Sequence, residues 1–217
     1  MKSELTISLL CEEANQFARI ESSREHASLF GVTDGKAIGT YVEHQFREYL
    51  SQRYSFTEGS SARGIDFPDL AVDMKVTSIK QPQSSCPFQS ARQKIFGLGY
   101  SLLVFVYEKE DNQAFETGRL RFFHTVFVNE AQTADYQTTV GLRQILENDG
   151  NEDDLTAFMF DRNLPVDEIE AYRMAQELLN NPPNIGYLTI SNALQWRLQY
   201  RRIIDQAGQV EGILKIL

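Results

Sequence analysis

The chain has 217 residues, 42% of them hydrophobic and 24% charged, a composition typical of a globular domain. Its formal charge of −9 argues against a protein that coats nucleic acid without sequence preference, because such binding depends on neutralising phosphates. No stretch is apolar enough to span a membrane, no signal peptide is evident, and Cys11 and Cys86 form no zinc or disulfide pattern. We therefore expect a single soluble domain, residues 1–217, in the cytoplasm.

The negative charge is unevenly distributed. Residues 1–30 carry five acids and three bases, and residues 111–217 carry sixteen acids and nine bases. Residues 31–110 carry nine of each, so the middle of the chain is neutral. A divalent cation bound by acids of this segment would offset them locally. The charge distribution therefore leaves room for a specific enzyme that acts on DNA.

The pattern of apolar residues predicts both helices and strands. In chain order we expect helices over about 5–30 and 36–52, strands near 63–67 and 70–78, a helix over 90–96, and strands over 100–108 and 119–128. In the remaining part we expect a helix over 138–148, a solvated acidic loop over 147–154, a helix over 166–180, a break at 180–184 followed by a short strand, and a last helix over 191–206. This mixture predicts an α/β or α+β fold, a small mixed sheet flanked by helices. We expect a catalytic core over about 31–130 and a C-terminal helical part, 131–217, that serves DNA recognition or dimerisation.

The segment GIDFPDLAVDMKVTS, residues 64–78, carries the chemistry. If 70–78 is a strand, its side chains alternate between two faces. The apolar face is made of Leu70, Val72, Met74 and Val76, and the other face of Ala71, Asp73, Lys75 and Thr77. Two opposite charges on an otherwise apolar strand need a partner or a metal, because burying a charge is costly.

Two further acids are expected near this pair. A turn at residues 67–70 would fold Asp66 back beside Asp73, and two converging carboxylates suit Mg²⁺. Lys75 would then lie beside a scissile phosphate, where it stabilises developing charge or helps to deprotonate water. Glu43 lies on the apolar stripe of the helix over 36–52 and is predicted to reach the same site. Each fragment alone is typical of a surface ion pair or a solvated acid, and only their combination favours a nuclease.

In this order, the helix acid, the Asp-x₆-Asp-x-Lys hairpin, the next helix and the apolar strand resemble the PD-(D/E)xK nuclease superfamily, which includes most type II restriction endonucleases. The run DFPDLAVDMKVTS is most similar to the hairpin of the mismatch-repair nicking endonuclease that cuts unmethylated strands, and of restriction enzymes related to it. The resemblance covers about a third of the chain, residues 36–107.

The resemblance implies roles for individual residues. Asp66 and Asp73 would ligate Mg²⁺ together with the Met74 carbonyl, and Lys75 would be the catalytic lysine. Glu43 would be the helix acid. Lys94 falls where the mismatch-repair branch has another active-site lysine, although a phosphate-contacting or solvated lysine is an equal alternative. The literal Pro-Asp pair here is Pro68-Asp69, so Asp69 is the alternative to Asp66 as first ligand.

Several side chains outside this hairpin have the chemistry to contact DNA. Arginine, asparagine and glutamine read base edges in the major groove, and arginine also binds phosphate. On these grounds we expect DNA contacts from Arg63, Gln81, Gln83, Arg197 and Arg201. The alternative for the helix expected over 191–206 is an ordinary amphipathic surface helix.

These inferences converge on a type II restriction endonuclease that uses Mg²⁺ to hydrolyse double-stranded DNA. The resemblance implies 5′-phosphate ends, and cutting both strands of a palindrome predicts a homodimer. Restriction also predicts a cognate DNA methyltransferase gene nearby. Two alternatives remain open at this stage: a repair nuclease of the same superfamily that nicks one strand, and a non-catalytic DNA-binding regulator on a degenerate nuclease fold.

Overall fold

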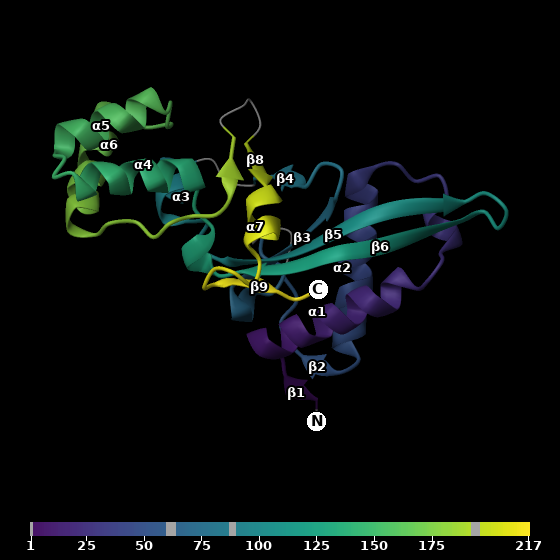
Figure 1. Cartoon of the computed structure of the whole chain (residues 1–217). Helices are drawn as coiled ribbons and strands as arrows, with labels where there is room; N and C mark the ends of the chain where they lie inside the picture. The colour runs from purple at the N-terminus through teal and green to yellow at the C-terminus, as the bar shows by residue number, and fades with distance from the viewer. Residues whose placement is uncertain (1, 60–63, 87–89, 192–195) are drawn as a thin grey trace.

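The computed structural model describes residues 2–59, 64–86, 90–191 and 196–217 (Figure 1). Its centre is a four-stranded sheet in the order β3 (Val72–Ser78), β5 (Ser101–Asn112), β6 (Thr117–Val128) and β9 (Ile213–Lys215). β3 runs parallel to β5, and the other neighbours are antiparallel. The sheet is mixed, as predicted, and β3 lies at its edge.

Two long helices cover one face of this sheet. α1 (Ile7–Ser22) contacts β6, and α2 (Gly35–Ser51) contacts β3. Their N-termini are capped by Thr6 and Asp34, whose side chains accept hydrogen bonds from backbone N–H groups of the first turn. Apolar residues of both helices belong to one core cluster with residues of β3, β5 and β6. The core between them contains Phe17, Phe46, Phe105, Val72 and Met74.

The opposite face of the central sheet packs against a second, smaller sheet. Its order is β4 (Gln83–Ser85), β8 (Arg197–Gln199) and β7 (Thr189–Ile190), all antiparallel. α7 (Arg201–Gln206) follows β8. Alternation along β5 explains the division, because Leu103 and Phe105 belong to the helix-covered core whereas Leu102 and Val104 belong to this one.

A third apolar cluster joins the helices at one end of the molecule (Figure 1). These are α3 (Ala91–Phe96), α4 (Tyr136–Glu147), α5 (Glu152–Asp161) and α6 (Glu168–Asn180). The remaining elements are short: β1 (Ser3–Glu4), β2 (Tyr54–Ser55), and 3₁₀ turns η1 (Ala27–Leu29), η2 (Pro68–Leu70) and η3 (Glu130–Gln132). None of the helices in the described ranges could cross a membrane. The α/β fold class is confirmed.

Three local predictions were wrong. The first helix ends at Ser22, not near residue 30. The strand expected over 63–67 is not formed in its described part, where Phe67 makes only an isolated bridge to Val72. The acidic run does not stay a loop, because Asn151 caps α5 and Asp154 completes a capping box, and acids in a first turn favour a helix.

The helix expected over 191–206 is also wrong. Residues 192–195 lie outside the described ranges, and residues 197–199 form strand β8 before the short helix α7. The buried residues Trp196, Leu198 and Tyr200 recur every second position, which is the period of a strand. Arg197 and Arg201 therefore lie on different elements and do not share a helix face.

Candidate active site

A tight turn brings Asp66 against the open edge of β3. Phe67 and Val72 exchange backbone hydrogen bonds of 2.9 and 3.2 Å around η2. Ala71 closes this turn in the left-handed region, with φ of 50°. Non-glycine residues rarely adopt this conformation, so the turn is held by its surroundings. Asp66 thereby lies opposite Asp73, the arrangement predicted from the spacing.

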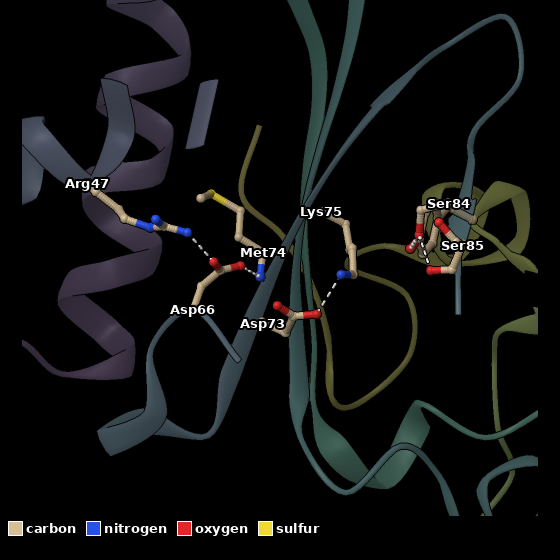
Figure 2. Close-up of polar contacts among 8 residues, drawn as sticks. Arg47, Asp66, Asp73, Met74, Lys75, Ser84 and Ser85 are labelled. Carbon is tan, nitrogen blue, oxygen red and sulfur yellow. Dashed lines mark hydrogen bonds and ion pairs between the residues drawn. The ribbon is translucent and has the colours of Figure 1, made fainter. Parts of the chain in front are cut away.

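Asp66 bridges α2 and β3 (Figure 2). Its Oδ2 accepts a hydrogen bond of 2.8 Å from the Met74 backbone N–H, and its Oδ1 pairs with the Arg47 guanidinium. In a strand, the N–H and C=O of one residue point to the same side. The Met74 carbonyl therefore also faces the open edge, on the side of Asp66.

Asp73 is almost completely buried, with 2% of its surface exposed. Its Oδ2 lies 2.7 Å from Lys75 Nζ, and Figure 2 shows the two side chains turned toward each other. Burial raises the pKa of Asp73 to about 7; the charge of Lys75 opposes the rise, and Asp66 adds to it. A carboxylate held out of water beside another carboxylate is a group suited to a cation.

α2 contributes Glu43 and Arg47, one turn apart. Burial, and then the negative charge of Asp66, raise the pKa of Glu43, whereas Arg47 and Lys75 lower it. These causes place Glu43 within electrostatic reach of the strand residues, as expected from the helix stripe. Arg47 was missed from the sequence. Its position four residues after Glu43 on the same stripe was the available signal.

An open cleft with a volume of about 770 Å³ runs past this group. Glu43, Lys75 and the predicted DNA contacts Gln81, Gln83 and Arg197 line it. The cleft also takes in Lys36 and Thr40, to which sequence reasoning assigned no role, together with Thr77, Ser84 and Ser85.

Three other candidates lie away from the carboxylate pair, and a fourth falls outside the described residues. Asp69 Oδ2 accepts a hydrogen bond of 3.0 Å from Thr57 N–H, which favours Asp66 over Asp69 as the site carboxylate. Lys94 is buried with Nζ 5.3 Å from the centre of the Trp196 ring, and the nearby charges that affect its pKa are Asp135 and Arg162. Arg201 lies outside the described cleft lining, 3.4 Å from Asp205. Arg63 lies outside the described residues.

Comparisons with known proteins decide the family. A family model described as type II restriction enzyme NspV matches residues 4–215. Type II restriction enzyme NspV of Nostoc sp. (strain ATCC 29411 / PCC 7524) is 63% identical over 212 residues, which are 98% of this chain and 96% of that protein. The chain belongs to the NspV family of type II restriction enzymes. No solved structure matches it.

Membership of the NspV family confirms the predicted class, a type II restriction endonuclease, over almost the whole chain. The family model extends far beyond residues 36–107, the part on which the superfamily resemblance rested. Residues 108–217, which suggested no family by themselves, therefore belong to the same enzyme.

The candidate site offers oxygen donors of the kind that Mg²⁺ prefers. Within the described residues no group of three or more His, Cys, Asp or Glu is assembled as a metal site. The carboxylates of Asp66 and Asp73 nevertheless converge with the backbone carbonyl of Met74. Asp73 Oδ2 is buried, and its ion pair with Lys75 does not have the geometry of a hydrogen bond. Oxygen donors completed by water suit Mg²⁺, which keeps part of its hydration shell. The residues therefore fit one such ion.

Proposed function

We propose that this NspV-family chain cuts both strands of double-stranded DNA at a specific sequence by Mg²⁺-dependent hydrolysis. The observation that carries this proposal is the convergence of Asp66, Asp73 and Lys75 at β3, beside a cleft that Lys75 and Glu43 line. The resemblance of the hairpin to PD-(D/E)xK nucleases supports the same assignment, and it implies 5′-phosphate and 3′-hydroxyl ends.

Each residue has a distinct role in this proposal. Asp66, Asp73 and the Met74 carbonyl hold the cation, and Glu43 supports it from α2. When bound, Mg²⁺ lowers the pKa of a coordinated water and neutralises charge on the phosphate. Lys75 orients the attacking water and stabilises the developing negative charge. The attacking water gives up one proton to solvent as its oxygen bonds to phosphorus, the bond to the 3′-oxygen breaks, and that oxygen takes up a proton, so that one water is added across the bond.

The proposed catalytic set leaves out Lys94. Its side chain packs on Trp196, and the charged groups that affect its pKa are Asp135 and Arg162, not the carboxylates of the set. Gln81, Gln83 and Arg197 are proposed to contact DNA from the cleft. We further propose a homodimer, because two-fold symmetry places one active site on each strand, and a cognate methyltransferase that protects the host.

The decisive experiment digests plasmid and phage DNA with Mg²⁺ and sequences the ends. We expect double-strand breaks at one sequence, loss of cleavage in Asp73→Ala, and full cleavage in Asp153→Ala, an exposed acid on α5. Cleavage that survives Asp73→Ala would overturn the site assignment. Nicks in place of double-strand breaks would favour a repair nuclease, and no cleavage with Mg²⁺ or Mn²⁺ would favour a regulator on a degenerate fold.

A further inference from the structure

β4 and β8, residues 83–85 and 197–199, are neighbouring strands of the second sheet, with the two-residue strand β7 on the other side of β8. We call this pair of strands the β4–β8 ribbon; its two faces differ in chemistry. The register pairs Gln83 with Gln199, Ser84 with Leu198 and Ser85 with Arg197. Because side chains alternate along a strand, Gln83, Ser85, Arg197 and Gln199 lie on one face and Ser84 and Leu198 on the other. Ser85, Arg197 and Gln199 are exposed, and Gln83 is half-buried. The outer face of the ribbon is therefore a row of hydrogen-bonding side chains.

The inner face holds the ribbon rigidly. Leu198 is fully buried in the core beneath the central sheet. Ser84 Oγ lies 2.5 Å from the hydroxyl of the buried Tyr200, and Tyr200 N–H donates to the Pro82 carbonyl at 2.8 Å. Figure 2 shows Ser84 and Ser85 beside the cleavage strand on the side that Lys75 faces. The outer side chains thus project from a backbone that is fixed on its other side.

Thr77 connects this ribbon directly to the cleavage strand. Its hydroxyl accepts a hydrogen bond of 2.9 Å from Gln83 N–H, and it can donate to the carbonyl of Gln83 at 3.1 Å or of Gln81 at 3.3 Å. Thr77 is 4% exposed and stands two residues after Lys75 on the same face of β3. The position of the ribbon is therefore fixed relative to Lys75.

The ribbon and the cleavage residues share one cleft. Gln83, Ser85 and Arg197 line it together with Glu43 and Lys75. Gln199 lies outside the lining but is paired with Gln83 and shares the same face of the ribbon. The major groove of B-DNA admits a two-stranded ribbon, and arginine pairs with guanine and glutamine with adenine by two hydrogen bonds each. A polar sheet face is ordinarily just solvated, but this one borders the place where the scissile phosphate is proposed to bind.

We propose that the outer face of the β4–β8 ribbon reads base edges in the major groove, with Arg197, Gln199 and Gln83 as the specificity-determining side chains. This inference rests on the proposed function and deepens it, because it assigns how the substrate sequence is selected. Arg197 recognises a guanine, and the two glutamines recognise adenines in neighbouring base pairs. Thr77 is a positioning residue that keeps this reading in register with the bond that is cut.

The test measures binding separately from cleavage. The probe is a synthetic duplex that carries the sequence found at the cut ends, together with duplexes that change one base pair at a time, all with Ca²⁺ in place of Mg²⁺. We expect Arg197→Ala to bind the intact site about tenfold to a hundredfold more weakly and to lose discrimination at one G·C pair of each half-site. Gln199→Ala should do the same at a different pair.

Two variants serve as matched comparisons. Arg173→Ala, which removes an exposed arginine on α6 outside the described cleft lining, should leave affinity and discrimination unchanged. Thr77→Val removes the hydroxyl and should weaken discrimination at every pair read by the ribbon, whereas Thr77→Ser should restore it. Equal weakening of matched and mismatched duplexes by Arg197→Ala and Gln199→Ala would overturn the proposal, because it would show phosphate contacts alone. Failure of the proposed function would appear separately, as cleavage that survives Asp73→Ala.

Discussion

The cleavage site and the β4–β8 ribbon border the same cleft but are built in opposite ways. Asp73 is buried, and Lys75 and Arg47 compensate the two carboxylates. On the ribbon, Arg197 and Gln199 are exposed on an antiparallel pair whose other face is core. The difference shows how one protein meets two requirements. Acting on a phosphate needs charges held out of water, and reading bases needs donors and acceptors left available.

The largest effect that separates the two regions should come from Lys75→Met. Losing a positive charge beside the phosphate should slow cleavage about a hundredfold to a thousandfold, because charge stabilisation in a site shielded from water is strong. Duplex binding with Ca²⁺ should change by less than about threefold, since we place this lysine outside base recognition. Lys80→Met, five residues along and exposed, is the control. A variant that loses binding as much as cleavage would erase the distinction.

The next effect concerns pH and the buried carboxylate. Because the pKa of Asp73 is raised to about 7, the group is protonated below that pH and must lose its proton to bind a cation. Mg²⁺ binding, measured by calorimetry, should weaken by roughly tenfold for each pH unit below 7. Without metal, the folded chain binds this proton more tightly than the unfolded chain does, so stability falls as pH rises from 3.8 to about 7.

The control for this pH dependence is Asp73→Asn. Its thermal unfolding without metal should lack the loss of stability between these two pH values. An unchanged stability profile would show that the ion pair with Lys75 outweighs the effect of burial. By contrast, discrimination by the ribbon should be flat over the same pH range, because arginine and glutamine do not titrate there.

A smaller effect is expected from Arg47→Met. This change frees Asp66 from its cationic partner, so the apparent affinity for Mg²⁺ should rise while the maximal cleavage rate falls roughly tenfold through loss of orientation. Arg47→Lys should recover part of the rate. Arg53→Met, which removes an exposed arginine just beyond α2, should do neither. A parallel fall of affinity and rate would mean that Arg47 only supports the fold.

The smallest effect should come from Asp69→Asn. Asp69 is exposed and its carboxylate accepts from Thr57 N–H, so cleavage should stay within about twofold of the unchanged chain. Asp66→Asn, three residues earlier, should abolish cleavage. Quantitative end-labelled cleavage of one plasmid site measures both. If the two results were exchanged, Asp69 would be the ligand and the turn would have to rearrange.

The cleavage hairpin could be predicted because its information is local. Asp66, Asp73 and Lys75 fall within ten residues, and strand alternation with a Pro-Asp turn is enough to bring them together. The long apolar strands and most helices were predicted for the same reason. Arg47 was missed because a single arginine on a helix is ordinarily solvated, and its partner Asp66 lies in another element.

The ribbon could not be predicted because its strands are short and distant. Ser84 and Tyr200 meet across 116 positions of sequence, and strands of three residues show too little alternation to recognise. The apolar residues between Leu194 and Ile204 have helical spacing, which predicted a helix. Residues 197–199 instead form a strand, because Leu198 packs into the core beneath the central sheet. Tertiary contacts therefore overruled the local pattern where DNA recognition is proposed.

The turn between the two carboxylates has a consequence for conformational entropy. Ala71 holds its left-handed conformation at a cost of roughly 1 kcal/mol, which glycine would remove. Glycine would also multiply the conformations open to the unfolded chain and to the turn itself. Alanine at this position therefore exchanges some stability for a narrower range of distances between Asp66 and Asp73. The spacing of the two acids is then set before any ion or DNA arrives.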